Sequence, residues 1–426
     1  MSRREFHFIS GASSKFWAIE MKGESFDVTF GKIGTAGTTQ SKVFADAAAS
    51  KKAYDKLVLE KTSKGYVEVG GDKSAGATSP TDSSRKDSPK GKSADASSTE
   101  PLNELYFSTT KDISDMGNLN SFLGKKVANF KSLKSIKKGD GTIYAIRVSY
   151  EDEEDEDGPA DFMERLNSFL DSDAALKAIG LVLGNWSLDG PEPCSEIIQT
   201  LIAKKDHLPN LVGLFHGDIA QEENEISWIE QTDMTDVLNA FPKLELFRVR
   251  GGTGLSFVSA KHNKLRALGV ETGGLSRVVV GQICQATFPE LEYLELWLGD
   301  AGYGGDTAVS DLQPLFKGKL FPKLKYLGLR NSEITDEIAG VIVNSPIVRQ
   351  LKSLDLSLGT LSDEGAQALM KLPQDARLKR LDLHRHFLSN AMLKQLKTLP
   401  FTLNVLGQEK PDDFGDGDRR FVAIGE

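Results

Sequence analysis

Two places in this chain have residue types suited to chemistry: two histidines beside an aspartate, and a glycine-rich stretch that lies earlier in the sequence. Asp382, His384 and His386 have the composition of a catalytic cluster, but no serine or cysteine stands in the strand–turn–helix context of a nucleophile. We interpret them as surface residues of the last repeat. The stretch GDAGYGGD at residues 299–306 lacks the Lys and Ser/Thr of a phosphate-binding loop. We therefore expect no catalytic residue, no cofactor and a protein that is not an enzyme.

Metal ligation has equally little support in the sequence. The acidic run EDEEDED at residues 151–157 has neither the glycine nor the alternating ligands of a calcium loop, which favours a solvated insertion. Cys194 and Cys284 stand far apart, without a CxxC partner or a histidine cluster at metal spacing. We predict no metal site, and we expect both thiols to be reduced and buried.

Length and composition indicate a chain of two or more domains. The chain has 426 residues, a formal net charge of −9 and ordinary hydrophobic content. The first residues, MSRREFHFIS, form no apolar signal segment, and about 18 uninterrupted apolar residues occur nowhere. We expect a cytoplasmic protein that does not span a membrane.

A repeated hexapeptide with leucine at its first, fourth and sixth places determines the architecture. Clear copies begin at Leu291, Leu324, Leu351 and Leu378, with spacings of 33, 27 and 27 residues. Looser copies begin at Ile143, Leu176, Leu211, Leu244 and Leu265, which makes eight or nine units. Periods of this length predict a leucine-rich repeat solenoid, with parallel strands and outer helices, over residues 104–426.

Each clear repeat continues into a predicted helix. Thr335, Ser362 and Ser389 lie 27 residues apart, each just before a helix-like run. We expect Thr335 and Ser362 to cap their helices, because a hydroxyl oxygen can accept a hydrogen bond from a free backbone N–H. Acidic residues follow in the first turn, where the helix dipole favours them.

A polar segment separates the repeats from a small N-terminal part. Residues 71–100 contain no aromatic and no large aliphatic side chain, so we predict a disordered linker over residues 71–103. Residues 1–70 carry 11 Lys and Arg against 8 Asp and Glu, a net charge of +3, whereas residues 101–426 carry 36 against 48, a net charge of −12. Any contact with a nucleic acid is therefore expected in the N-terminal part.

The N-terminal part reads as strands within residues 16–45 and a helix from Asp46 to about Lys61. The stretch FGKIGTAG, the alanine spacing around Phe44 and the closing EKTSKGY resemble a WGR domain over residues 6–69. WGR domains occur in DNA-dependent poly(ADP-ribose) polymerases, where the signature Trp and Arg contact DNA. Phe30 and Lys32 stand at those two places here. The resemblance implies DNA or RNA binding by a set of five residues: Trp17, Phe30, Gly31, Lys32 and Lys42.

An alternative reading remains open for two of these residues. Alternation within FDVTFGKIG puts Phe30 on the same strand face as Phe26 and Val28, so Phe30 also fits a core position. Trp17 is equally consistent with packing beneath the sheet.

The repeat part resembles a bacterial cytoplasmic leucine-rich repeat family of unassigned activity, through stretches such as FHGDIAQEENEISWIEQ and LELWLGDAGYGGD. Residues between the leucines should point out of the solenoid and stack in columns on its concave face. We predict that Trp297 is exposed there and anchors a protein partner, because an indole that stays exposed to water costs solubility unless another protein covers it. The predicted partner surface comprises Arg248, Arg250, Glu271, Trp297, Arg330, Asp355 and His384. The alternative is an ordinary polar sheet face.

These features favour a non-enzymatic adaptor, with an N-terminal module that binds nucleic acid and a solenoid that binds another protein. The alternative is a protein–protein scaffold, or the regulatory subunit of an enzyme, that binds no nucleic acid.

Overall fold

A computed structural model describes residues 3–10, 13–44, 46–63, 66–69, 117–136, 143–149, 161–187, 192–221, 223–373, 377–413 and 418–425. The chain forms two compact units, Met1–Pro101 and Leu102–Glu426. The predicted linker, residues 71–103, and the acidic run at residues 151–157 lie outside the described residues. In the described ranges, every helix is too short or too polar to cross a bilayer.

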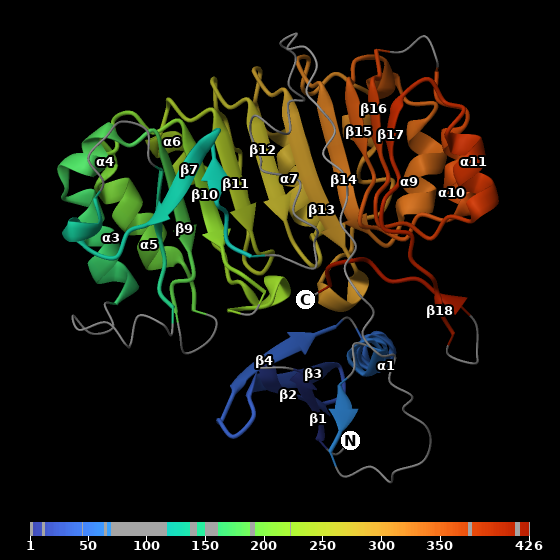
Figure 1. Cartoon of the computed structure of the whole chain (residues 1–426), viewed down its shortest axis with the longest axis horizontal. Helices are drawn as coiled ribbons and strands as arrows, with labels where there is room; N and C mark the ends of the chain where they lie inside the picture. The colour runs from blue at the N-terminus through green and yellow to red at the C-terminus, as the bar shows by residue number, and fades with distance from the viewer. Residues whose placement is uncertain are drawn as a thin grey trace, which may run out of the picture. The chain divides into compact units, whose positions relative to one another are not determined.

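The N-terminal unit is a five-stranded antiparallel sheet with one helix (Figure 1). The strand order is β4-β3-β2-β1-β5. The bounds are β1 (Arg4–Ser10), β2 (Ser13–Met21), β3 (Ser25–Lys32), β4 (Thr38–Val43), α1 (Ala47–Ser63) and β5 (Val67–Glu68). The predicted strands and helix are confirmed, and the structure adds β1 and β5.

The second unit is built on one twelve-stranded sheet, in which the strands follow chain order from β6 to β17 and are parallel from β7 onward. Figure 1 shows these strands side by side in one row. Their bounds are β6 (Ser121–Phe122), β7 (Lys125–Asn129), β8 (Ile143–Ile146), β9 (Gly180–Gly184), β10 (Gly213–Asp218), β11 (Leu246–Arg250), β12 (Ala267–Glu271), β13 (Tyr293–Gly299), β14 (Tyr326–Ser332), β15 (Ser353–Asp355), β16 (Arg380–Asp382) and β17 (Thr402–Asn404).

Short helices connect these strands and cover one side of the sheet. They are α3 (Phe162–Leu170), α4 (Asp173–Lys177), α5 (Ser195–Ala203), α6 (Thr235–Ala240), α7 (Arg277–Gln285), α8 (Gln313–Phe316), α9 (Thr335–Ile342), α10 (Asp363–Leu369) and α11 (Asn390–Leu396). Two short antiparallel strands, β18 (Asp412–Asp413) and β19 (Asp418–Arg419), follow the sheet. The predicted solenoid of parallel strands and outer helices is confirmed.

The repeated leucines form the core of the solenoid. Leu294, Leu327, Leu354 and Leu381 lie opposite one another on successive strands, and all are fully buried. Parallel strands whose aliphatic side chains stack in this way exclude water along the whole array, which is how a repeat protein builds a continuous core.

The predicted helix caps are confirmed at one of the two positions. Ser362 accepts a hydrogen bond from the N–H of Glu364 at the start of α10. Thr335 is instead the first residue of α9, and its hydroxyl donates to the carbonyl of Ser332 at 2.6 Å, so its expected cap is wrong. The hydroxyl thus binds the preceding strand and not the helix end.

The predicted register of the first two repeats is wrong by two residues. Leu181 pairs with Leu214 and therefore occupies the fourth hexapeptide position, whereas the copy starting at Leu176 predicts the sixth. Tyr144 pairs with Leu181 and also belongs at the fourth position, whereas the copy starting at Ile143 predicts the second. A shift of two residues leaves the same side chains facing the core, so alternation could not reveal the error. Strands β7 and β17 further extend the sheet beyond the predicted copies.

Candidate functional site

The concave face is the side of the sheet formed by the residues that alternate with the core leucines. Its predicted columns are confirmed, since Arg250 lies opposite Glu271 and Trp297 lies opposite Arg330. The neighbouring column runs through Arg248, Gly269, Glu295, Gly328, Asp355 and Asp382. Parallel pairing therefore places charges from five or more repeats beside one another.

The expected exposure of these side chains is wrong. Glu271 is 0% exposed, Trp297 4% and Arg250 5%. Six of the seven predicted partner-binding residues are buried: Arg248, Arg250, Glu271, Trp297, Arg330 and Asp355. Only His384 keeps partial access, with 22% of its side chain exposed. These charged side chains can be buried because they form ion pairs with one another on this face.

One part of this network surrounds Glu271. Arg250 Nε donates to Glu271 Oε2 at 2.7 Å, and Arg248 forms an ion pair with the same carboxylate. Both guanidinium groups also lie over the ring of Phe215, 5.2 and 5.4 Å from its centroid. Burial lowers the pKa of Arg250 to about 10, but the group stays charged at neutral pH. The contacts of Arg248 and Arg250 with Glu271 are therefore charge-assisted, and both guanidinium groups pack against the ring of Phe215.

A second part surrounds Glu295. Its carboxylate accepts hydrogen bonds from Trp297 Nε1 at 2.8 Å, from Arg330 Nη1 at 3.1 Å and from the hydroxyl of Tyr293. The Arg330 guanidinium lies 5.3 Å from the Trp297 ring centroid. Burial alone would raise the pKa of Glu295, but Arg330 and Arg248 outweigh it and hold the pKa at about 2. Trp297 is thus a member of an ionic core and not a bare anchor.

Two tyrosines connect this part to the next repeat. The rings of Tyr293 and Tyr326 stack with centroids 4.0 Å apart, and the Tyr326 hydroxyl donates to Asp355 at 2.8 Å. Asp355 also lies 3.5 Å from Arg330 Nε. The network therefore crosses the sheet without a break from β11 to β15.

The predicted histidine cluster is divided between two environments. Asp382 accepts a hydrogen bond from His384 Nδ1 at 2.7 Å and two from Asn404 Nδ2 at 3.0 Å. His386 is fully buried, and its Nε2 lies 3.1 Å from the carbonyl oxygen of Val405, so our placement of it at the surface is wrong. His386 packs at the turn after β16, where backbone groups need a partner. The three residues do not converge on one point.

The cysteines are both free thiols, as expected. Cys194 is buried and Cys284 half-buried, and burial raises their pKa values to about 12 and about 11. Neither thiol is poised as a nucleophile, because a reactive cysteine needs a lowered pKa.

In the N-terminal unit, Trp17 belongs to the core. It is 1% exposed, its ring centroid lies 5.5 Å from that of Phe6, and Lys61 Nζ lies 5.4 Å from it. Of the two possibilities for Trp17, the structure supports packing beneath the sheet and not contact with a nucleic acid, because α1 covers the sheet face on which Trp17 lies. Phe30 pairs with Trp17 across β2 and β3 and is half-buried.

The other three predicted contact residues lie along β3 and β4. Gly31 is half-buried, and a Cβ there would lie 2.9 Å from the Cα of Gly37. Lys32 ends β3, and Lys42 pairs with Phe26 near the opposite end of that strand. The structure thus groups residues 30–32 but separates them from Lys42 by about four to six strand positions, roughly 13 to 20 Å.

Sequence reasoning missed the residues that complete the network and close its edges. Tyr293 and Tyr326 occupy the third hexapeptide place of adjacent repeats, and this coincidence could have indicated the stack. Asp218 accepts the backbone N–H of Leu119 and pairs with Arg147 at 3.0 Å. No sequence signal indicated that contact, since the partners lie 99 and 71 residues away.

Comparison with known proteins agrees with the division of the chain into an N-terminal unit and a repeat unit. Residues 2–73 match the WGR domain and residues 349–370 match a leucine-rich repeat. The chain is 46% identical over 71 residues to protein YehF and 36% identical over 66 residues to the uncharacterized protein YfeS, both from Escherichia coli K12. These matches cover 17% and 16% of this chain, and they span only 26% and 27% of the two relatives.

A protein from Bacteroides fragilis, solved as a crystal structure by a structural genomics consortium, is similar over nearly the whole length. The two chains are 30% identical, the TM-score is 0.58, and the alignment covers 96% of this chain and 97% of the other. The chain therefore belongs to the same family as this Bacteroides fragilis protein, and it joins a WGR domain to leucine-rich repeats. The relatives named here are all bacterial.

Proposed function

We propose that this chain is a non-enzymatic adaptor of the bacterial cytoplasm that brings a nucleic acid and a protein partner together. The observation that carries the proposal is the presence of a WGR domain and a leucine-rich repeat sheet in one chain. The two free thiols agree with a reducing compartment.

The nucleic acid contacts are assigned to the end of β3 and the turn that follows it. Phe30 is half-buried near the end of β3, an aromatic residue of the kind that stacks on a base or sugar, and Lys32 follows two residues later. The turn residues 34–37 are exposed. The tight approach of Gly31 to Gly37 fixes the turn, since any side chain at Gly37 would meet Phe16 at 2.4 Å.

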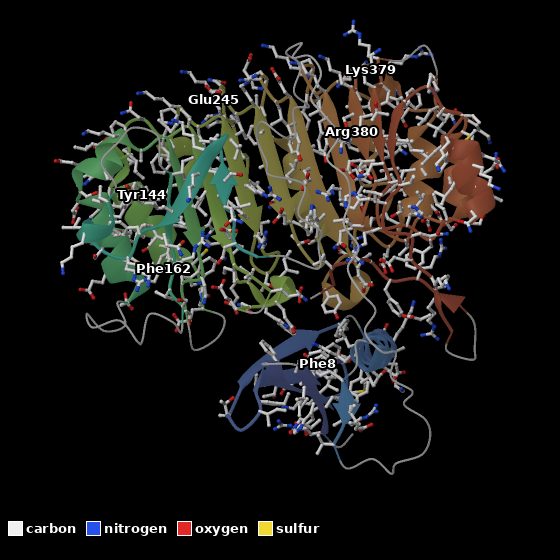
Figure 2. The ribbon with its side chains drawn as sticks, in the orientation of Figure 1. Phe8, Tyr144, Phe162, Glu245, Lys379 and Arg380 are labelled. Carbon is white, nitrogen blue, oxygen red and sulfur yellow. The ribbon has the colours of Figure 1, made fainter. Side chains whose placement is uncertain are left out.

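The protein partner is assigned to the C-terminal end of the concave face. At that end, 22% of the His384 side chain and 28% of the Arg380 side chain are exposed to solvent. Arg380 lies on the strand row and Lys379 at its rim (Figure 2). The buried network from Arg248 to Asp355 supports this surface from behind, because it fixes the strands that carry it.

One observation favours the alternative of a scaffold without nucleic acid binding. Several described cations of the N-terminal unit are already paired with acids, with Arg4 bound to Glu68 at 2.7 Å and Lys51 bound to Asp55 at 2.6 Å. Paired cations contribute less to phosphate binding, since the acid must first be displaced.

Titration of the full chain with fluorescein-labelled duplex and single-stranded DNA and RNA tests the proposal. We expect binding that weakens as salt rises, and a several-fold loss in Phe30→Ala. Val67→Ala is the matched control, because Val67 is 69% exposed and lies on β5, away from this turn. Absence of binding to every probe at low salt would leave the scaffold alternative.

A further inference from the structure

The C-terminal segment of the chain lies in an extended form against the loops that follow the central strands. Residues 418–425 pass below β13 and β14 in Figure 1. The Ala423 N–H donates to the carbonyl of Leu358 at 2.8 Å. Val422 and Ile424 are 7% and 3% exposed. The segment is therefore held through both its backbone and its side chains.

Asn331 recognises the backbone of this segment. Its side-chain oxygen accepts the Ile424 N–H at 2.9 Å, and its side-chain nitrogen donates to the Ile424 carbonyl. Asn331 is fully buried and has a φ of 50°, a left-handed conformation that asparagine tolerates better than most residues. A residue in a left-handed conformation whose side-chain amide pairs with both the N–H and the C=O of one extended residue has the geometry of a peptide-binding residue.

The side chain of Ile424 fills an apolar pocket. It packs with Ile226, Trp297 and Leu358 in a buried cluster that is separate from the core between sheet and helices. Gly425 follows Ile424 in the chain and packs directly against Gly273. A Cβ on Gly273 would lie only 2.3 Å from the Gly425 carbonyl oxygen. The pocket thus fits an aliphatic residue, and the bare backbone of Gly273 lets the following peptide unit approach closely.

An outer contact holds the segment at its other end. Arg420 Nη1 donates to Asp336 Oδ2 at 2.9 Å and to the Thr360 carbonyl at 2.7 Å. One third of the Arg420 side chain remains exposed, so this contact is open to solvent and contributes less than the buried ones.

We propose that these loops form a peptide-binding site, which we call the tail site, and that the C-terminal segment is its internal occupant. The tail site consists of Ile226, Gly273, Trp297, Asn331, Asp336 and Leu358. Its second ligand is an extended segment of a partner protein in which a basic residue precedes, by four positions, an aliphatic residue followed by glycine. The inference rests on the proposed protein-binding role of the repeats, adds a second contact surface to the concave-face contact at Arg380 and His384, and names the chemistry of the partner segment that binds there.

Because the C-terminal segment already fills the tail site, a partner must compete with it, and this competition sets the affinity that the partner needs. A tethered segment acts at an effective concentration on the order of millimolar, so a free peptide sees only the fraction of molecules in which the tail has left. Partner binding and tail release are therefore one equilibrium, and weakening the tail must strengthen partner binding.

The test uses the purified full chain and a fluorescein-labelled peptide with the sequence of residues 419–426, RRFVAIGE. Fluorescence anisotropy compares the unaltered chain with two tail variants, Ile424→Asp and Arg420→Glu. We expect the peptide to bind Ile424→Asp at least about tenfold more tightly than the unaltered chain, and Arg420→Glu to lie between them. Adding Asn331→Ala to Ile424→Asp should reverse the gain, and a labelled peptide with aspartate in place of the isoleucine should not bind.

The inference is overturned if both tail variants melt cooperatively near the temperature of the unaltered chain and yet bind no peptide, because a folded chain with a weakened tail then has no site that accepts this segment as a free peptide. It is also overturned if light scattering shows a dimer that Ile424→Asp abolishes, since the occupant is then the tail of a second copy. Nucleic acid titration of the same samples separates the two proposals. Lost peptide binding with retained DNA or RNA binding removes the tail site alone, and the reverse result removes the nucleic acid role alone.

Discussion

Arg250 and Glu271 face each other across β11 and β12, 21 residues apart in the chain, with 2.7 Å between Nε and Oε2 and almost no solvent access. The spacing between them is the shortest among the hexapeptide copies, which begin only 21 residues apart here, at Leu244 and Leu265. Stacking of the strands absorbs the missing residues in the connection and keeps the two charges opposite each other. Charge pairing on the concave face is thus a product of strand register.

Removal of one partner from this network should be costly. We expect Glu295→Ala to lower the free energy of unfolding by about 3–5 kcal/mol, because Arg248 and Arg330 would remain buried without their shared carboxylate. Urea denaturation followed by circular dichroism measures this. The matched control is Glu245→Ala on the rim of the same sheet, where the carboxylate is 42% exposed and a change within about 0.5 kcal/mol is expected. Equal losses in both variants would contradict a special role for the buried carboxylate.

Truncation of Trp297 should now destabilise the solenoid, contrary to what its sequence context suggested. Trp297→Ala is expected to cost about 3–5 kcal/mol and Leu296→Ala about 2–5 kcal/mol, since both side chains are buried. Differential scanning calorimetry of the two variants checks this. A stable Trp297→Ala variant with an unchanged melting temperature would show that the indole is not packed as the structure describes.

Acid should weaken the network in a defined pH window. The folded-state pKa of Glu295 is about 2, below its ordinary value of 4.5, so its contribution to stability is complete above about pH 4.5 and is lost as the pH falls toward 2. The shift corresponds to roughly 3 kcal/mol. We expect the free energy of unfolding to fall across this window, and less steeply in Glu295→Gln. The same slope in both proteins would assign the acid sensitivity to other carboxylates.

Leu123 and Gly213 should be energetically coupled. Leu123, just before β7, packs over Gly213, where a Cβ would lie 2.7 Å from its Cδ1. We expect Gly213→Ala to cost about 1–3 kcal/mol in the unaltered chain and less in a Leu123→Ala background, because the obstructing side chain is then absent. A double-mutant cycle from urea denaturation gives the coupling. Additive losses would mean that the two residues do not touch in solution.

The N-terminal unit shows how far alternation alone can be taken. The spacing of Phe26, Val28 and Phe30 placed these side chains on one face of a strand, and the structure confirms that face for Phe26 and Val28, which are fully buried. For Trp17, the strand pattern is consistent with either a core position or a ligand contact. Its burial is decided by α1, whose Lys61 lies against the indole, and nothing in the strand itself indicates that contact.

What the sequence alone determined is the periodic part of this protein. Leucines that recur every 27 to 33 residues specify a strand, a turn and a helix in each unit, and identical units can bury their leucines only by stacking, so the solenoid and its columns follow from local pattern. Only the tertiary structure determines which columns of side chains on the concave face are exposed to solvent. Burial of Trp297, Glu295 and Arg330 depends on partners one or two repeats away, and occupation of the tail site joins Asn331 to Ile424 across 93 residues. Such contacts have no period in the chain, because chain folding and not local propensity brings their partners together.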